Sequence, residues 1–520
     1  MKKDIVIMSC PIMEPIPPMA PVLLTACLKK EGITSIAKDL NIDFFNEFKD
    51  SGYWGDIHNL FAIGHVTDIK IPRRLLINIL KFIKRYLLDI KREHDPKYIG
   101  LSIFTSESVD FSILITSYIR KYLPETKIVL GGRGLENLHG LTGLKHYEMY
   151  DQFGMADLLI VGDAETSLPL ALKTDAQGVF FSEQQTKEDL DNIPSPLWDD
   201  YDLSVYNTAI SSVSENLRYM GITASKGCVR QCTFCDVKHF WPKYIFRDGA
   251  NVARDIIHNY RSTGITNFFF TDNLINGSVS NYKKMNEILA REIPNEIEYQ
   301  GYAIMRQREH QPEEDFELAA RAGSKRWIIG VESGCEKIRN EMKKKFSNDD
   351  IDYTAEQLFK NKITQSWLFI VGYPSETEED FVETLELLKR SQHLGKDGLL
   401  RINVTPPYMH IPTNNMNTDP DLARYYGLEN LNFRDPLTVH FWTSSQYPDN
   451  TFLVRVDRWR RLINLSLELG LTWHDERLIS KWKNEIDGLE KVYLERFKGK
   501  DHIINEPKII SIHQVYPQDK

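Results

Sequence analysis

Three of the six cysteines of this 520-residue chain lie within eight positions. Cys228, Cys232 and Cys235 follow the spacing CxxxCxxC, inside the stretch GCVRQCTFCDV. Thiolates gathered so closely are suited to hold a metal ion or a metal cluster. The other cysteines are scattered along the chain, so a disulfide framework is not expected. The spacing predicts a metal centre held by these three residues.

Two kinds of metal centre fit three thiolates. A structural zinc ion takes four ligands in a tetrahedron, and His239, four residues after Cys235, could be the fourth. A zinc knuckle usually organises a small unit, whereas these cysteines follow the first strand of a large predicted α/β domain. A cubane iron–sulfur cluster with three thiolate ligands leaves one iron open for a small molecule. A non-catalytic zinc protein, and cysteines that are merely buried, remain as alternatives.

The predicted elements around the cysteines alternate between short apolar strands and helices. Such alternation predicts a parallel sheet with crossover helices. Six strands indicate a partial TIM-like barrel, (β/α)6, whose chemistry is expected in the loops after the strands. The cysteines fall in the loop after the first strand. The predicted strands span residues 219–225, 267–273, 298–305, 326–333, 366–374 and 399–407.

This cysteine spacing, in this loop, resembles the radical S-adenosylmethionine (SAM) enzymes. The resemblance implies that Cys228, Cys232 and Cys235 hold a [4Fe-4S] cluster whose unique iron binds the amino and carboxylate groups of SAM. It also implies that one electron from the reduced cluster breaks the C5'–S bond of SAM. The resulting 5'-deoxyadenosyl radical would abstract hydrogen from the substrate. An external electron donor of the flavodoxin or ferredoxin type is implied as a partner.

Residues near the cysteine motif extend the resemblance. Phe234 holds the aromatic position before the last cysteine and is expected near the adenine of SAM. Asp272 and Asn273, at the end of the second predicted strand, are expected to face the amino end of SAM.

Two later motifs resemble the same family. Glu332 and Ser333, in IGVESG, are expected to reach the ribose or methionyl part of SAM. Gly372 and Tyr373, in FIVGYPSET, are expected beside the adenine, although Ser375 replaces the usual glycine of this motif. Each motif alone is weak, since a glutamate at a strand end is as often a salt-bridge partner or a helix cap. Their order behind the cysteines makes coincidence a poor explanation.

The first part of the chain shows a similar alternation and predicts a Rossmann-like open sheet. Such sheets bind ligands at the carboxyl ends of their strands. The layout resembles the cobalamin-binding domain that precedes the barrel in a large radical SAM subclass. The predicted strands span 4–9, 34–40, 98–105, 127–132 and 157–162, and the predicted helices span 20–30, 109–123 and a segment from 164.

The second resemblance implies contacts with cobalamin. Ser102, Thr105 and Ser106 would lie against the corrin and its nucleotide tail. Gly131 and Gly132 would let the tail pass close to the backbone, because glycine has no side chain.

Glu165 would lie in the loop before the following helix. A histidine ligand to cobalt is not expected. His58 lies in DIHNLF, which is similar to the DxHxxG motif of the methionine synthase type, but Phe61 replaces the glycine. That motif should also follow the first strand, near Ser9. In the radical SAM subclass the cobalt commonly lacks a protein histidine.

Composition limits the other classes. The chain is 42% hydrophobic and 26% charged, with a formal net charge of −9, so a surface built for a phosphate backbone is not expected. The basic stretch from Lys81 is interpreted as the solvated face of an amphipathic helix. No apolar run is long enough to span a bilayer, and the start leaves no room for a signal peptide. A reducing cytoplasm is the expected location.

The remaining cysteines and three tryptophans are interpreted as packing residues. Cys10, Cys27 and Cys335 have apolar surroundings or follow a motif, and are expected to be small buried hydrophobes. The tryptophans could line a pocket, but packing of the C-terminal helices is the preferred interpretation. They are Trp442, Trp459 and Trp473.

These patterns predict four regions. Residues 1–181 form a cobalamin-binding-type α/β domain, 182–217 a linker, 218–407 the radical SAM barrel and 408–520 a mainly helical region. We expect an enzyme that uses the cluster, SAM and cobalamin to methylate an unactivated position of a small-molecule or peptide substrate. Radical rearrangement or other hydrogen abstraction without cobalamin is the alternative within the family. A transfer-RNA-modifying radical SAM enzyme is another.

Overall fold

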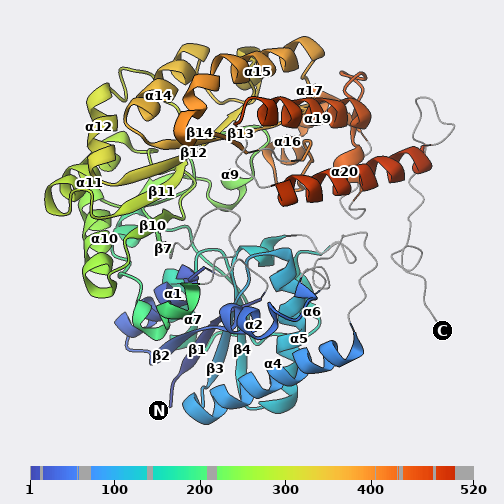
Figure 1. Ribbon diagram of the computed structural model, residues 1–520. Coiled ribbons are helices and arrows are strands. Elements are labelled where there is room, and N and C mark those ends of the chain that lie inside the picture. Colours follow the sequence, from blue (N-terminus) through green and yellow to red (C-terminus); the bar gives the residue numbers. More distant parts are fainter. Residues whose placement is uncertain are drawn as a thin grey trace. The chain divides into compact units, whose positions relative to one another are not determined.

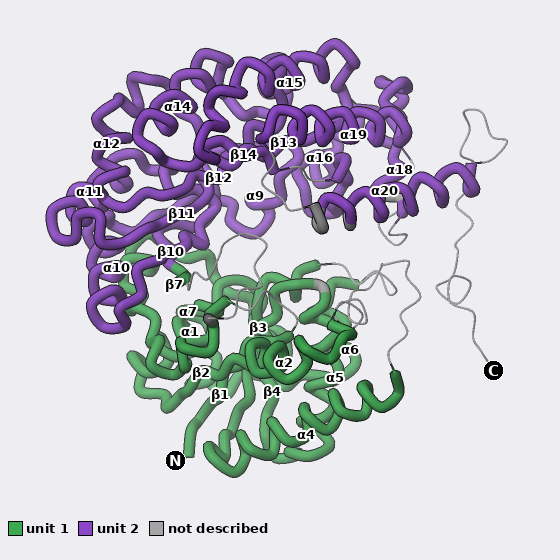
Figure 2. The backbone as a smooth tube through the Cα atoms, in the orientation of Figure 1, with its two compact units in different colours: residues 1–221, 509–520 green, residues 222–508 purple. Residues whose placement is uncertain are grey.

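The computed structural model of the chain divides into two compact units, residues 1–221 and 222–508 (Figure 2). Each unit is described by itself. The residues that the structure describes are 2–11, 16–54, 57, 72–137, 144–207, 219–403, 406–429, 431, 437–471 and 476–497.

The first unit is built on a six-stranded sheet in the order β2-β1-β3-β4-β5-β6, with every recorded pairing parallel (Figure 1). The order reverses between β1 and β3, where open sheets of this kind bind ligands. The Rossmann-like fold is confirmed, but the sequence missed β6. The strands are β1 (Ile5–Ser9), β2 (Ser35–Asp39), β3 (Tyr98–Ser102), β4 (Lys127–Gly131), β5 (Leu158–Val161) and β6 (Gly178–Phe181).

The apolar strand β1 is buried on both faces. Val6 and Met8 belong to one core cluster, while Ile5 and Ile7 belong to another. Alternate residues of a strand point to opposite faces, so a continuous apolar run needs cover on both sides. The helices of this unit are α1 (Met19–Lys30), α2 (Leu40–Phe48), α4 (Arg73–His94), α5 (Ser106–Tyr122), α6 (His146–Gln152), α7 (Ala164–Lys173) and α8 (Lys187–Asp191), with 3₁₀ turns η1 (Arg133–Glu136), η2 (Trp198–Asp200) and η3 (Leu203–Asn207).

The basic segment predicted as an amphipathic helix is α4. It buries an apolar stripe, and Phe82 packs edge to face on Phe44 of α2 with ring centroids 5.8 Å apart. Its charged residues Lys81, Lys84 and Arg85 are exposed. The amphipathic interpretation is confirmed, and both α2 and α4 contribute to the core of the first unit.

The second unit contains a six-stranded sheet in the order β14-β13-β12-β11-β10-β7, so its strands add in chain order (Figure 1). The recorded pairings from β10 to β14 are parallel. This is the predicted partial barrel. The strands are β7 (Tyr219–Ile222), β10 (Asn267–Phe270), β11 (Glu298–Ala303), β12 (Ser324–Glu332), β13 (Thr364–Phe369) and β14 (Leu400–Asn403), with small two-stranded sheets β8 (Ser225–Lys226) and β9 (Ile245–Phe246), and β15 (Leu428–Glu429) and β16 (Thr443–Ser444).

Helices connect these strands and continue into a mainly helical C-terminal region (Figure 1). Among the described helices, none combines the length and apolar character that crossing a membrane requires. The helices are α9 (Val237–Phe240), α10 (Gly249–Thr263), α11 (Val279–Glu292), α12 (Glu313–Arg321), α13 (Glu336–Glu341), α14 (Asn348–Lys360), α15 (Glu378–Arg390), η4 (Gln392–Gly398), α16 (Asn415–Thr418), α17 (Pro420–Tyr426), α18 (Thr438–Phe441), α19 (Phe452–Glu468) and α20 (Glu476–Arg496).

Several strands end earlier than the sequence predicts. The strand predicted over 219–225 stops at Ile222, because the backbone N–H of Ala224 donates to the Asp272 carboxylate at 2.9 and 3.1 Å instead of to a strand. The strand predicted over 366–374 stops at Phe369 and gives way to a loop. In both places the apolar run continues into residues that build the site.

A substitution at Gly132 tests the packing of the first unit. Its φ is +116°, and a Cβ there would lie 2.2 Å from the carbonyl oxygen of Ile103. Gly132→Ala is expected to lower the free energy of unfolding by about 2–4 kcal/mol, because backbone strain and the clash add. Gly154 also has positive φ but faces open space, so Gly154→Ala should cost about 1 kcal/mol. Urea unfolding measures the free energy of unfolding of both variants. Equal losses in Gly132→Ala and Gly154→Ala would contradict the close packing of Gly132 on Ile103.

Candidate functional site

The cysteine loop lies between β8 and β9, which pair as a small antiparallel sheet near the start of the second unit. Gly227 directly follows β8 with φ +79°, and a Cβ there would lie 2.6 Å from the carbonyl oxygen of Lys243. Only glycine fits this turn without moving the backbone. The turn leads the chain directly to Cys228.

The three thiols are free and largely withdrawn from solvent. Cys232 is buried, while Cys228 and Cys235 are half-buried. Burial raises the pKa of Cys232 and of Cys235 to about 11, and raises the pKa of Cys228. A cation bound by the sulfurs would offset this desolvation of the thiolates.

Two backbone groups favour the thiolate form. The N–H of Arg230 donates to Cys228 Sγ at 3.3 Å, and the N–H of Val237 donates to Cys235 Sγ at 3.5 Å. Hydrogen bonds to the charged form of a group stabilise that form. Both observations fit a cluster held by thiolates.

A buried lysine lies beside the cysteines, and the sequence analysis missed it. Lys344 Nζ is 2.8 Å from Glu332 Oε1 and 5.8 Å from the ring centroid of Phe234. Burial alone would lower the pKa of Lys344, but the Glu332 carboxylate and the sulfurs of Cys232 and Cys228 raise it above its usual value. The charge of Lys344 in turn favours the thiolates. Local sequence could not reveal it, because it sits in a run of three lysines.

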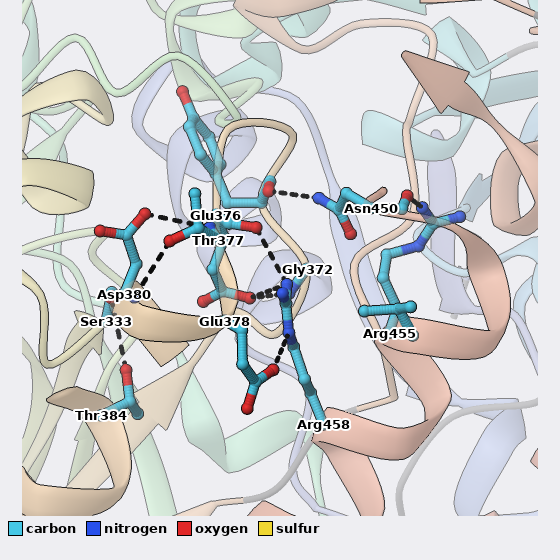
Figure 3. A network of polar contacts seen from close by, with 12 residues as sticks. Ser333, Gly372, Glu376, Thr377, Glu378, Asp380, Thr384, Asn450, Arg455 and Arg458 are labelled. Atoms are coloured by element: carbon cyan, nitrogen blue, oxygen red, sulfur yellow. Dashed lines mark hydrogen bonds and ion pairs between the residues drawn. The ribbon is translucent and has the colours of Figure 1, made fainter. Parts of the chain in front are cut away.

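Glu332 occupies a strained backbone position at the end of β12, with φ +68°. A Cβ at Gly330 would lie 2.0 Å from Glu332 Oε1, so the glycine of this motif gives the carboxylate room to meet Lys344. Residues held in this region of backbone space cluster at functional sites. The neighbouring Ser333 is fully buried, accepts a hydrogen bond from the Cys335 N–H at 3.1 Å and lies 3.4 Å from Thr384 Oγ1 (Figure 3).

Asp272 is buried against the backbone that leads to the cysteines. Its carboxylate accepts the Ala224 N–H, and burial raises its pKa to about 7. Asn273 beside it is half-buried. These contacts support the cysteine loop, and a contact of either residue with SAM stays a prediction.

The loop after β13 is held by the C-terminal region (Figure 3). Gly372 has φ +85°, and a Cβ there would lie 2.3 Å from Arg455 Cδ of α19. The Gly372 N–H donates to Glu376 Oε2 at 2.8 Å, and Arg458 Nη1 lies 3.4 Å from the same oxygen. Asn450 Nδ2 donates to the carbonyl of Tyr373 at 2.7 Å. Helix α19 and the residues just before it, such as Asn450, therefore fix the backbone of this loop.

Tyr373 joins three parts of the second unit. It is fully buried, and its hydroxyl lies 2.7 Å from Thr233 Oγ1 of the cysteine loop and 2.6 Å from the Tyr426 hydroxyl of α17. The buried Arg455 stacks on Trp442 with 3.8 Å from its guanidinium carbon to the ring centroid. The cysteine loop, the loop after β13 and the C-terminal helices thus form one connected structure.

The interpretation of several residues as packing residues is confirmed where the structure describes them. Trp442 and Trp459 are fully buried, whereas Trp473 lies outside the described residues. Cys10, Cys27 and Cys335 are buried, and the Cys335 thiol also donates to the carboxylates of Asp380 and Glu383.

The predicted cobalamin contacts lie at the carboxyl edge of the first sheet. Ser102 ends β3, and Thr105 caps α5 by accepting the Ser108 N–H at 3.1 Å. Ser106 begins α5, and its side chain is outside the described part of the structure. Parallel strands bring their carboxyl ends together, so these residues share one edge of the sheet.

The two glycines that follow differ in their surroundings. Gly131 ends β4, and a Cβ there would make ordinary contacts with Ile160, whereas Gly132 is pressed against the Ile103 backbone. Glu165, in the first turn of α7, accepts a hydrogen bond from Gln185 at 3.3 Å. His58 lies outside the described residues.

Comparison with known proteins identifies the barrel. Residues 222–388 match the radical SAM superfamily. A putative methylthiotransferase of Methanocaldococcus jannaschii is 28% identical over 244 residues, which cover 45% of this chain and 52% of that protein. The chain thus spans about half the length of this curated relative.

Two solved structures share the fold. One is the radical SAM methyltransferase TsrM of Kitasatospora setae, with cobalamin and a [4Fe-4S] cluster bound. It superposes with a TM-score of 0.56 at 16% sequence identity, and the aligned part covers 82% of this chain and 77% of the TsrM chain. The other is the cobalamin-dependent radical SAM enzyme OxsB, with aqua-cobalamin and SAM bound. It superposes with a TM-score of 0.55 at 16% sequence identity, and the aligned part covers 82% of this chain and 55% of the OxsB chain. The match and the cysteine spacing together show that residues 222–388 form a radical SAM domain, which implies SAM and a [4Fe-4S] cluster, and the chain shares the fold of TsrM and OxsB.

Proposed function

We propose that this protein is a cobalamin-dependent radical SAM methyltransferase that methylates an unactivated position of a small-molecule or peptide substrate. The observation that carries the radical SAM part is the CxxxCxxC trio Cys228, Cys232 and Cys235, largely withdrawn from solvent inside the segment that matches the radical SAM superfamily. The cobalamin part is supported by the doubly wound first sheet and by the fold shared with TsrM and OxsB.

The residues around the cysteines have distinct proposed roles. When bound, the cluster supplies the electron that breaks the C5'–S bond of SAM, and cobalamin carries the methyl group. Glu332 and Lys344 offer one charge of each sign, suited to the ammonium and carboxylate of the methionyl group. The backbone at Gly372 and Tyr373, with Phe234, forms the proposed support for the adenine. An external carrier of the flavodoxin or ferredoxin type supplies the electron.

A second candidate is a methylthio-transferring enzyme that acts on transfer RNA. The similarity to the putative methylthiotransferase supports the methylthio transfer, and similarity to tRNA-2-methylthio-N(6)-dimethylallyladenosine synthases supports the RNA substrate. A protein that binds RNA through phosphate contacts loses affinity steeply as salt rises. A salt-sensitive gel shift with transfer RNA, retained after SAM and cobalamin are removed, would favour this candidate over the small-molecule methyltransferase.

The cluster assignment is tested by Cys232→Ala. Anaerobically reconstituted wild type should be brown and carry about four irons per chain. The variant should lose most of this iron and form no 5'-deoxyadenosine, because one iron loses its ligand. Cys10→Ala is the matched control, since Cys10 is also a buried free thiol and should leave the iron content unchanged. Iron analysis measures the cluster content, and chromatography measures the 5'-deoxyadenosine formed. A Cys232→Ala variant that still cleaves SAM reductively would refute the mechanism.

The loop after β13 gives a pH prediction. Burial raises the pKa of Glu376 from 4.5 to about 7, so the folded chain holds this proton at a pH where the unfolded chain has released it. The free energy of unfolding should therefore fall as pH rises through this window. Glu376→Gln removes the titration but keeps an acceptor for the Gly372 N–H. From pH 5 to pH 8 the wild type should lose about 1–3 kcal/mol more than the variant in urea unfolding of the apoprotein. Equal losses of unfolding free energy in the wild type and the variant would show that Glu376 is ionised over this whole pH range.

Cobalamin binding is tested with Gly131→Ala. A Cβ at Gly131 makes only ordinary contacts inside the protein, so the unfolding temperature should not change by more than about 2 °C. If the nucleotide tail passes this backbone, the added methyl group should weaken cobalamin binding about tenfold, or about 1.4 kcal/mol. Absorbance titration with hydroxocobalamin measures the affinity. A wild type that binds no corrinoid would remove cobalamin from the proposal.

A further inference from the structure

We propose that Arg230, Lys343 and Lys345, called here the cationic rim, are the docking surface for an acidic one-electron carrier protein of the flavodoxin or ferredoxin class. This inference rests on the proposed function, because a chain that cleaves SAM reductively needs an electron from outside. The carrier would lose one electron and the centre held by the cysteines would gain it, with no bond or proton transferred.

The cations of the cationic rim lack carboxylate partners within the part of the chain that the structure describes. Lys343 and Lys345 are exposed. Lys344, between them, is buried and pairs with Glu332. Arg230 Nη2 donates to the carbonyl oxygen of Lys345 at 3.3 Å, which places its guanidinium beside the lysine loop. The charges of Lys343 and Lys345 are therefore available to a partner, with the half-buried Arg230 beside them.

Glu341, the last residue of α13, is already engaged by another part of the second unit. Glu341 accepts a hydrogen bond from the Ser375 hydroxyl. The chain as a whole carries a formal net charge of −9, so a group of unpaired cations is a local exception. Such an exception attracts an acidic surface and orients its approach.

The backbone of the cationic rim favours glycine at both lysine positions. Lys343 has φ +61° and Lys345 has φ +57°. Lys343 directly follows Met342, the C-cap of α13, where helices commonly end on glycine. Side chains with a Cβ are strained in this region of backbone space. Lysine at both positions therefore keeps charge on the surface at a conformational cost, and glycine can replace it there without added strain.

The cationic rim lies along the cysteine loop. The Thr233 N–H donates to the Met342 carbonyl at 3.3 Å, and the Arg230 N–H donates to Cys228 Sγ at 3.3 Å. Val229, next to Cys228 in the chain, is 39% exposed. A carrier seated on the cationic rim would thus have a short path to the cysteine sulfurs, and electron transfer slows steeply with distance.

The double variant Lys343→Gly/Lys345→Gly tests the docking surface. With an acidic flavodoxin and the reconstituted full chain, calorimetry at low salt should show about a tenfold rise in Kd and a weaker salt dependence than in the wild type. Formation of 5'-deoxyadenosine driven by subsaturating reduced flavodoxin should fall in parallel. Formation driven by dithionite should stay at the wild-type rate. The unfolding temperature should not fall, because glycine relieves the strain at both positions.

Lys362→Gly is the matched control. Lys362 is also exposed, also has φ +56° and also forms no ion pair among the described residues. It precedes the amino end of β13, whereas Glu332 and Lys344 lie at the carboxyl end of the neighbouring parallel strand β12. This variant should bind flavodoxin as tightly as the wild type does.

Each outcome has a separate meaning. Unchanged flavodoxin affinity in the double variant would overturn the docking surface. Loss of affinity that is equally large in Lys362→Gly would overturn it too, since general charge would then explain binding. Binding of transfer RNA that depends on the two lysines, without binding of flavodoxin, would assign the surface to nucleic acid. A wild type that forms no 5'-deoxyadenosine with dithionite would instead refute the proposed function.

Discussion

The second unit depends on how three buried thiols are kept competent to bind a cation. Burial favours the neutral thiol, and it raises the pKa of Cys232 and of Cys235 to about 11. Backbone N–H donors and the buried Lys344 act in the opposite direction. Lys344 can remain charged there because Glu332 lies 2.8 Å away, and a buried charge without a partner is strongly destabilising. The cysteine loop and the Glu332 motif are therefore parts of one electrostatic arrangement.

The C-terminal helices belong to the same arrangement. Arg458 lies between Glu376 and Glu378, and the buried Glu376 accepts the Gly372 N–H and so fixes the backbone there. Tyr373 then connects this loop to Thr233 in the cysteine loop. A change in α19 would reach the cysteines through these two steps. The boundary predicted at residue 407 thus divides residues that lie in one compact unit.

The sequence predicted the elements and the candidate metal-binding residues, because both leave local patterns. Apolar runs and the CxxxCxxC spacing can be read directly, and the α/β fold with a partial barrel followed from them. Lys344 and Arg458 could not be identified in this way, since an isolated lysine or arginine resembles any solvated charge until its partner in the fold is known. Strand ends were missed for a related reason: the Asp272 carboxylate takes the Ala224 N–H, and that contact joins residues 48 positions apart.

The glycines of the first unit show why a motif can have two explanations. Gly131 and Gly132 were both assigned to the nucleotide tail of cobalamin. The structure explains Gly132 by the Ile103 backbone alone, so its presence carries no information about a ligand. Gly131 has no such internal reason, since a methyl group would fit. The case for a ligand at this edge of the sheet therefore rests on Gly131 and on the topology, in which the strand order reverses between β1 and β3.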